Sequence, residues 1–261
     1  MPSQSQLKHL SSLKLSKFRQ KYGQFVVEGR KAVEEVFHSR WKVLGIWCTE
    51  EFAKRHSPEY PYELMSWSEN KKLSSMETPP GVLAWVEKYN FSEATAADFR
   101  ENEQENNSPS NTHFTLLLDG ISDPGNLGTL IRLADWYGLS SIVASVDTVD
   151  AFNPKVLAAS MGSFLRVQVI YTSLQSWIVD FPGTVMGADL HGESVYNCEV
   201  SNQLALVIGS ESHGLRKEVK EVLHKCITIP KVGQAESLNA SVAAAIAMDN
   251  LLRKMQIVGG K

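Results

Sequence analysis

The sequence predicts an α/β protein with two domains, of which the larger contains a parallel β-sheet. In the second half of the chain, continuously apolar strand candidates alternate with helix-length segments, a pattern typical of a parallel sheet covered by helices on both faces. Residues 92–113 are acidic, polar and poor in apolar periodicity, so we expect an acidic linker or long exposed loop there. The expected domains are therefore residues 1–91 and 114–261.

The N-terminal domain is expected to be a small α/β sandwich, because strand and helix candidates alternate along it. A polar, helix-like stretch opens the domain. Strands are expected at 25–29, 43–50 and 81–89, and an amphipathic helix at 30–39.

The larger domain repeats this alternation more strongly. Strands are expected at 115–119, 141–145, 165–170, 184–189, 204–210 and 226–230, and helices at 127–138, 154–164, 174–181, 215–225 and 237–254. The last of these helices is rich in alanine and apolar almost all round in its first half, which predicts that it is buried against another element.

The composition is that of a globular protein without membrane spans. Hydrophobic residues make up 43% of the chain, but no run of about 18 apolar residues occurs. The N-terminus has no apolar stretch behind its charges and does not predict a secretion signal. Cys48, Cys198 and Cys226 are too few and too scattered for a disulfide framework or a zinc site, so we expect a reduced, cytoplasmic protein without a metal.

Charge is distributed unevenly along the chain. The net charge of −3 argues weakly against a nucleic-acid partner, but residues 1–31 contain a single acid, Glu28. The bases of this segment are Lys8, Lys14, Lys17, Arg19, Lys21, Arg30 and Lys31. Such a cluster is ordinarily a solvated face. The alternative is a surface that contacts RNA phosphates, with Lys14, Lys17 and Lys21 as the residues to test.

Candidate site residues follow three of the predicted strands, where ligands bind in open parallel sheets. After the first strand of the larger domain, Gly125, Asn126 and Gly128 stand where strand becomes helix, and Arg132 follows within that helix. Free N–H groups at such a helix start bind anions, although Asn126 would also serve as an ordinary N-cap. The spacing is not G-x-G-x-x-G, which argues against a nucleotide-dependent oxidoreductase.

The other two loops carry further polar residues. Gly209 and Glu211 end a buried strand, and Glu211 would either contact a ligand or cap the next helix. His213 is a candidate general base, but is ordinarily just a loop residue. In the third loop Ser237 is the candidate N-cap of the last helix, which leaves Asn239 unexplained.

Together the three segments resemble the three sequence motifs of the SpoU/TrmH family of RNA ribose 2′-O-methyltransferases, in the same order and at similar spacing. The matching residues are Asp119, Gly120, Asp123, Pro124, Asn126, Leu127, Gly128 and Arg132 in the first motif, Gly209, Glu211 and Gly214 in the second, and Ile229, Pro230, Gly233, Glu236, Ser237, Leu238 and Asn239 in the third. The N-terminal part is similar, more loosely, to the accessory substrate-binding domain of some members, through residues 25–36 and 78–87.

The resemblance implies a parallel sheet whose C-terminal part is threaded into a trefoil knot. It also implies S-adenosyl-L-methionine as cofactor, RNA as partner, and a homodimer through the knotted region, which the small apolar residues at 240–248 suit. Cofactor contacts, mainly through backbone groups, are implied at Gly187, Ala188, Asp189, Gly209, Ile229 and Leu238.

The implied reaction is methyl transfer to a ribose 2′-hydroxyl, which must lose its proton during attack. Arg132 would act as the base or as the positioner of the phosphate and hydroxyl, and a guanidinium, which stays protonated near neutral pH, is an improbable base. Asn126 would hold the ribose or orient Arg132, and Glu211 would pair with Arg132 or shape the cofactor loop. Ser237 and Asn239 would present polar groups to substrate or cofactor.

Ribosomal RNA is the expected substrate, because the N-terminal domain resembles extensions carried by rRNA-modifying members and contains the basic cluster. A tRNA ribose methyltransferase is the first alternative. A catalytically silent RNA-binding protein on the same scaffold is the second, and the retention of all five candidate catalytic residues counts against it.

Overall fold

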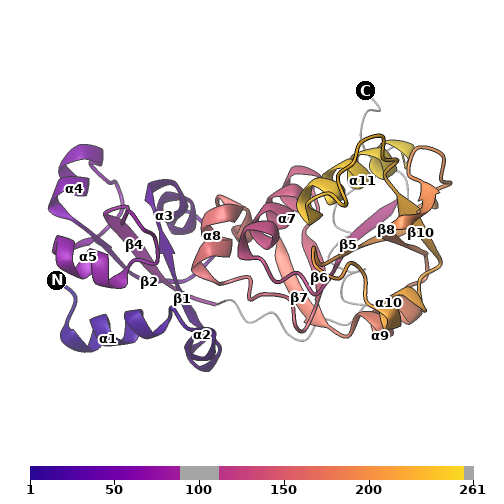
Figure 1. Cartoon of the computed structure of the whole chain (residues 1–261). Coiled ribbons are helices and arrows are strands. Elements are labelled where there is room, and N and C mark those ends of the chain that lie inside the picture. Colours follow the sequence, from indigo (N-terminus) through magenta and orange to yellow (C-terminus); the bar gives the residue numbers. More distant parts are fainter. Residues whose placement is uncertain (89–111, 256–261) are drawn as a thin grey trace. The chain divides into compact units, whose positions relative to one another are not determined.

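The computed structural model describes residues 1–88 and 112–255, and the chain divides into two compact units (Figure 1). Unit 1 comprises Met1–Phe91 and Asp150–Arg166, and unit 2 comprises Ser92–Val149 and Val167–Lys261. Most of the expected linker, residues 92–111, lies outside the described residues. The sequence pattern assigns residues 150–166 to the larger domain, whereas their contacts group them with the N-terminal unit.

Unit 2 contains a parallel sheet, which confirms this part of the expected α/β fold. Its strands are β5 (His113–Asp119), β6 (Ser141–Ser145), β7 (Gln168–Thr172), β8 (Thr184–Ser194), β9 (Gln203–Gly209) and β10 (Lys225–Thr228). Among the described residues their order is β10-β8-β9-β5-β6-β7, and each neighbouring pair is parallel. The central strands β5 and β9 are buried along almost their whole length, which explains why they are continuously apolar in sequence.

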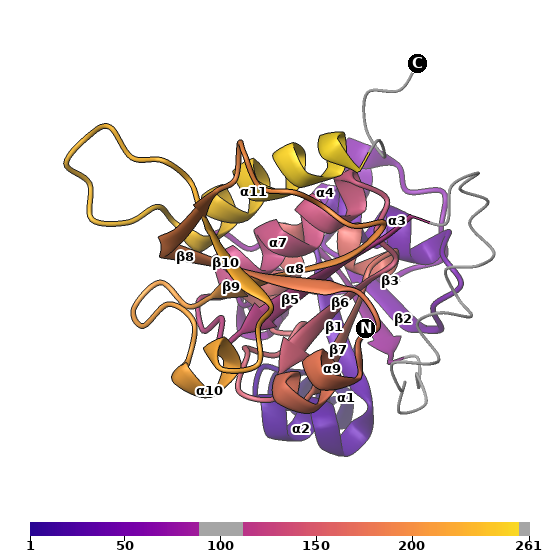
Figure 2. The same ribbon diagram turned by 90° about the vertical axis from the view of Figure 1, so that its right-hand side faces the viewer.

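Helices cover both faces of this sheet (Figure 2). On one face α7 (Pro124–Trp136) packs against α11 (Ala240–Lys254). On the other lie α9 (Leu174–Asp180) and the short α10 (Lys217–Lys220). The core under α9 joins Leu174, Trp177 and Ile178 to strand residues such as Leu117 and Val207. Burial of this apolar surface, at roughly 25 cal/mol per Å², is the main force that holds the layers together.

Several expected boundaries differ from the structure, among them those of two helices and one strand. The helix expected at 127–138 begins at Pro124, because Asp123 caps it and a proline suits its first position. The helix expected at 215–225 is reduced to α10, which starts after Arg216, whose backbone N–H is bonded to the Asp119 carboxylate, and Lys225 belongs to β10. The strand expected from residue 165 starts at Gln168, after a 3₁₀ turn at Ser163–Leu165.

Unit 1 is built on a mixed sheet of order β1-β4-β2-β3 in the described part of the chain. Its strands are β1 (Gln24–Glu28), β2 (Val43–Cys48), β3 (Glu63–Leu64) and β4 (Val82–Glu87), and its helices are α1 (Gln4–Ser12), α2 (Ser16–Tyr22), α3 (Arg30–Phe37), α4 (Glu50–His56), α5 (Trp67–Leu73) and α8 (Pro154–Ser160). The sequence does not predict β3, because two exposed residues carry no periodicity. Of the described helices, none is long and apolar enough to cross a membrane.

One face of the unit 1 sheet is covered by α1 and α5, through a core that includes Leu7, Leu10 and Trp47. The opposite face is covered in part by the segment that follows β6. The ring of Phe25 on β1 lies 4.7 Å from the ring of Phe152 and 6.1 Å from that of Phe164, centroid to centroid.

An ion pair fixes the start of the same segment. Nη2 of Arg19, whose side chain is only 2% exposed, lies 2.8 Å from a carboxylate oxygen of Asp150. Arg19 also donates to the carbonyls of Leu13 and Lys14. Residues 150–166 therefore complete the core of unit 1, although unit 2 strands precede and follow them in sequence.

This arrangement predicts how the chain responds to truncation. A fragment that starts at residue 112 keeps Phe152 and Phe164 but lacks Phe25, so these rings become exposed. We expect the fragment to bind a hydrophobic dye and to self-associate in size-exclusion chromatography. The matched control is the same fragment with Phe152→Ser and Phe164→Ser, which should bind less dye. A monomeric fragment that does not raise the fluorescence of the dye would contradict the packing of Phe152 and Phe164 against Phe25.

Candidate functional site

The pairing of β5 with β9 brings two motif loops together. The two strands run parallel in register from His113 opposite Gln203 to Asp119 opposite Gly209. Because both strands end at the same level, the first and second motif loops leave the same edge of the sheet. β8 and β10 lie beyond β9, so the third motif, which follows β10, starts from this edge too.

Asn126 is the residue on which the three motifs converge. Its amide nitrogen donates to the carboxylate of Glu211 in the second motif. Its amide oxygen accepts from Nδ2 of Asn239 in the third motif, at 2.8 Å, and from Oγ of Ser241, at 3.2 Å. We call these four residues the Asn126 cluster. Three of them are predicted as site residues from the sequence, and the structure brings these three into direct contact.

Because another residue caps α7, the side chain of Asn126 is free to join this cluster. The N-cap of α7 is Asp123, whose side chain accepts from the backbone N–H of Asn126 at 2.9 Å. The alternative in which Asn126 caps the helix is therefore wrong. Its side chain points to the other motifs, and the first turn of α7 is satisfied by a different residue.

The cap of α11 also differs from expectation. Asn239, not Ser237, caps this helix, because its side-chain oxygen accepts from the backbone N–H groups of Ser241 and Val242 at 3.0 and 3.3 Å. One amide group thus caps the helix with its oxygen and binds Asn126 with its nitrogen. This double function explains the asparagine for which the sequence alone gives no reason.

Sequence reasoning did not select Ser241 as a site residue. The side chain is buried, and Oγ also donates to the backbone carbonyl of Asn126 at 3.2 Å. The available signal was a hydroxyl two residues after Asn239 in an otherwise apolar helix. A serine so placed is also an ordinary first-turn residue, so the sequence alone does not separate the two uses.

A second residue that sequence reasoning missed holds the loop of Glu211 in place. Arg216 Nε donates to Oδ1 of Asp119 at 2.6 Å, and its backbone N–H donates to Oδ2 at 2.8 Å. Asp119 is buried at the end of β5, and the hydrogen bond to it raises the pKa of Arg216 above its ordinary value. The loop is closed by a bridge between Ser210 and Gly214. Glu211 caps no helix in the described residues, because α10 starts after Arg216 without a side-chain cap.

The remaining catalytic candidates do not join the cluster. Arg132 is exposed on α7, and within residues 1–88 and 112–255 no hydrogen bond or ion pair engages its guanidinium, so neither Asn126 nor Glu211 orients it. Ser237 is exposed in the loop before α11. His213 is exposed as well, with Nδ1 2.7 Å from Oγ of the neighbouring Ser212.

The expected cofactor residues are distributed over two neighbouring strands and the loop after a third. Gly187, Ala188 and Asp189 lie within β8, Gly209 is the last residue of β9, and Ile229 and Leu238 belong to the loop between β10 and α11. The Asp189 carboxylate is already paired with Lys220 Nζ at 2.5 Å and accepts from the His191 amide at 3.0 Å. Burial alone would raise the pKa of Asp189, but these hydrogen bonds and the Lys220 charge bring it below the ordinary value.

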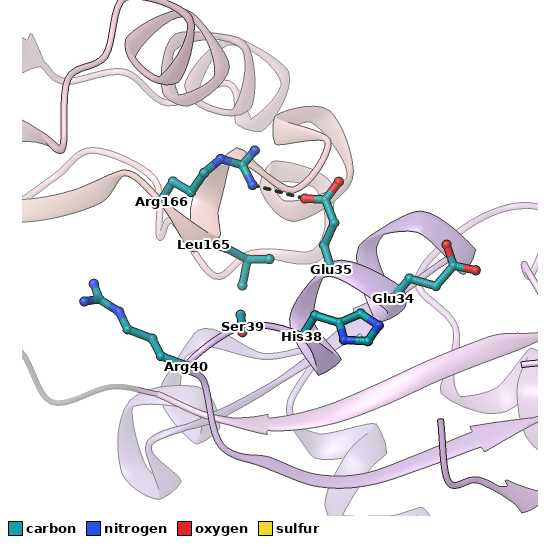
Figure 3. Close-up of a pocket in the computed structure, with 7 residues that line it drawn as sticks. All are labelled: Glu34, Glu35, His38, Ser39, Arg40, Leu165 and Arg166. Carbon is teal, nitrogen blue, oxygen red and sulfur yellow. Dashed lines mark hydrogen bonds and ion pairs between the residues drawn. The ribbon is translucent and has the colours of Figure 1, made fainter. Parts of the chain in front are cut away.

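A pocket in unit 1 is separate from these motifs (Figure 3). Its cavity volume is about 660 Å³. It is lined by Glu34, Glu35, His38, Ser39, Arg40, Leu165 and Arg166. Glu35 and Arg166 form an ion pair of 3.2 Å within it. None of these residues belongs to the three motifs, so the pocket is not the site that the sequence predicts.

The ion pair that supports the Glu211 loop yields a stability prediction. Arg216→Ala leaves the buried Asp119 carboxylate without its cation, and we expect the free energy of unfolding to fall by about 2–4 kcal/mol. Urea denaturation measures the change. The control Lys217→Ala removes a neighbouring exposed cation and should change stability by less than about 0.5 kcal/mol. Equal stabilities of the two variants would show that the pair does not hold the loop.

Comparison with known proteins assigns the fold and the motifs to one family. The model of the SpoU rRNA Methylase family matches residues 113–249, and that of the MRM3-like substrate binding domain matches residues 4–84. The chain is 31% identical over 253 residues to the 23S rRNA (guanosine(2553)-2′-O)-methyltransferase RlmP of Bacillus subtilis, covering 94% of this chain and 95% of that protein. It is 33% identical over 247 residues to the putative TrmH family tRNA/rRNA methyltransferase YacO of the same organism, covering 89% and 97%.

Solved structures agree with this assignment. A putative RNA methyltransferase of the TrmH family from Porphyromonas gingivalis has a TM-score of 0.80 and 31% identity, covering 97% of this chain and 99% of that one. The SpoU methyltransferase AviRb from Streptomyces viridochromogenes, in complex with AdoMet, also has a TM-score of 0.80, at 22% identity. The match covers 99% of this chain and 100% of that one and shows that the two share the fold. The chain therefore belongs to the SpoU rRNA methylase family.

Proposed function

We propose that this protein transfers a methyl group from S-adenosylmethionine to a ribose 2′-hydroxyl of ribosomal RNA. The observation that carries the proposal is the Asn126 cluster, which joins the three motif loops through side-chain hydrogen bonds. The similarity to RlmP, whose name states this reaction on 23S rRNA, extends over nearly the whole of both chains and supports the choice of RNA.

The residues present fit the methyl donor. In the loop between β10 and α11, residues 231–238 are exposed, and no described residue hydrogen-bonds their backbone groups. These groups are available to the polar edge of an adenine, in keeping with the backbone recognition that the family resemblance implies. The side chains of Leu190 on β8 and Leu238 in this loop are exposed and offer apolar surface. We therefore propose Gly187–Asp189, Gly209, Ile229 and Leu238 as the residues that hold it, with Asp189 contributing backbone groups.

When bound, S-adenosylmethionine supplies a methyl group already activated by its sulfonium. The chain must then place and activate the acceptor, and Arg132 is the residue proposed to act on it. A guanidinium stays protonated near neutral pH, so we assign Arg132 to binding the phosphate and orienting the hydroxyl rather than to accepting the proton. Its exposure and its lack of a partner among the described residues leave its donors available for this.

The Asn126 cluster is proposed to hold the ribose in a fixed position. Asn126 cannot rotate its amide without breaking hydrogen bonds on both sides, since Glu211 accepts from its nitrogen and two donors reach its oxygen. Polar groups fixed in this way need not reorganise during the reaction. Ser237 is proposed to contact substrate or cofactor from the exposed loop.

We further propose that the C-terminal part forms a trefoil knot and that two copies associate through it, in the cytoplasm. The strand order β10-β8-β9, in which the last strand returns past β9 to lie beside β8, is compatible with such threading. The loop between β10 and α11 projects from unit 2 (Figure 2), and its Val232 is fully exposed. Leu238 and Val242, close to it in sequence, are exposed as well, and exposed apolar side chains that gather in a patch mark association surfaces. Sedimentation at micromolar concentration tests this, and a monomeric mass for active protein would exclude it.

Activity provides the direct test of the reaction and its substrate. Purified protein with labelled S-adenosylmethionine and total bacterial RNA should place the label on ribose, as detected by mass spectrometry of the digested nucleosides. We expect the label in ribosomal RNA. Label found in tRNA alone would support the alternative of a tRNA ribose methyltransferase. A protein that binds RNA but transfers no methyl group would support the alternative of a catalytically silent RNA-binding protein. Label confined to bases would refute ribose methylation.

Arg132 is the residue whose substitution should separate chemistry from cofactor binding. Arg132→Ala should lower turnover by about 100-fold or more, because the acceptor is misplaced when its positioning group is removed. Its affinity for S-adenosylmethionine, measured by calorimetry, should stay within a few-fold. Lys155→Ala removes an exposed cation outside the motifs and serves as the control. Turnover of Arg132→Ala equal to that of this control would remove Arg132 from the mechanism.

A further inference from the structure

The N-terminal 27 residues contain no aspartate or glutamate, but only some of their cations face the solvent. Arg19 is buried against Asp150. Nζ of Lys14 donates to the carbonyls of Lys72 and Ser74, at 2.9 and 2.6 Å, and so holds α1 and α5 together. These internal hydrogen bonds make Lys14 a poor phosphate ligand, although its sequence position suggested that function.

Lys17 and Lys21 on α2 are placed differently. Both are exposed, and neither forms an ion pair with an acid in the part of the chain that the structure describes. Instead, each cation lies over an aromatic ring of the same helix. Lys17 Nζ is 5.1 Å from the centroid of Phe18, and Lys21 Nζ is 5.4 Å from that of Tyr22. The two rings are nearly parallel, with planes 9° apart and centroids 6.1 Å apart.

The aromatic surface continues beyond α2 and is held rigidly. The His9 ring lies 4.7 Å from the ring of Tyr22 and 5.2 Å from that of Trp85 on β4. Gln24 anchors both His9 and Trp85, because its side-chain oxygen lies 2.7 Å from His9 Nε2 and accepts from Trp85 Nε1 at 3.0 Å. Tyr22 remains 40% exposed despite these contacts. A large aromatic ring is thus fixed in place and still open to a ligand.

We propose that Lys17, Phe18, Lys21 and Tyr22, supported by His9, bind unpaired nucleotides of the substrate RNA. We call this surface the α2 platform. The proposal rests on the proposed function, since it identifies where the RNA is held. Ring faces stack on bases, and the two ammonium groups reach the phosphates on either side, which is the combination that single-stranded nucleic acid requires. A duplex keeps its base faces covered and would use the lysines alone.

Binding of an oligouridine of about 12 nucleotides to the full-length chain, followed by fluorescence anisotropy, tests the platform. Tyr22→Leu should weaken binding about tenfold, because the base can no longer stack on an exposed ring. Lys17→Gln with Lys21→Gln should lower the salt dependence, by about 0.7 in the slope of log K against log salt for each phosphate that the lysines no longer neutralise. Lys71→Gln, an exposed lysine on α5 of the same unit, is the matched control and should leave both quantities unchanged.

The outcomes separate this proposal from the proposed function. Methylation of RNA by the unaltered protein, together with weaker oligouridine binding by Tyr22→Leu and unchanged S-adenosylmethionine binding, supports both. If the protein methylates RNA but the Tyr22→Leu and double-lysine variants bind oligouridine like the control, the platform is wrong and the function stands. If the variants bind weakly but no RNA is methylated, the function is wrong and the platform stands. A further outcome is that the double-lysine variant binds oligouridine more weakly, Tyr22→Leu binds it normally, and the unaltered protein binds duplex RNA as well as oligouridine. This outcome would show that no base stacks on the platform. A thermal melt confirms that Tyr22→Leu is folded.

Discussion

Seven residues of β5 pair in parallel with seven residues of β9, and this register ends the two strands at Asp119 and Gly209. The candidate site depends on that alignment, because the loop after each strand supplies one partner of the Asn126–Glu211 hydrogen bond. The buried Asp119 carboxylate then binds both the side chain and the backbone of Arg216, which ties the second loop to the end of the first strand. The pairing of the two buried strands places both loops at the same edge of the sheet. The ion pair between Arg216 and Asp119 then fixes the second loop to the end of β5.

Two helix starts also meet at this edge, since α7 begins beside Asn126 and α11 beside Asn239. At each start a side chain satisfies part of the first turn, Asp123 in α7 and Asn239 in α11. The carboxylate of Glu211 contacts the same region through Asn126. The partial positive charge of the two helix starts is therefore balanced by the carboxylates of Asp123 and Glu211.

The strands of unit 2 could be predicted from the sequence, because buried parallel strands are continuously apolar, whereas in unit 1 the exposed β3 could not. The three loops could be predicted for the same reason, and resemblance to known motifs selected Asn126, Glu211 and Asn239. The sequence alone does not show which of several neighbouring polar residues caps a helix or contacts another loop. The contacts of Ser241 and Arg216 depend on which loops face each other in space, and capping by Asp123 and Asn239 is a choice among neighbouring polar residues. Residues 150–166 pack with unit 1 although the sequence pattern places them in the larger domain, since periodicity does not reveal which core a helix joins.

The insertion of residues 150–166 into unit 1 makes one core depend on two distant parts of the sequence. The backbone passes from one unit to the other three times, after Phe91, after Val149 and after Arg166. The family model that matches residues 113–249 runs straight through the inserted segment, although the segment's aromatic residues serve the core of the other unit. Residues 1–91 alone therefore lack Phe152 and Phe164, and a change at Phe25 acts on the packing of side chains more than a hundred residues away in the sequence.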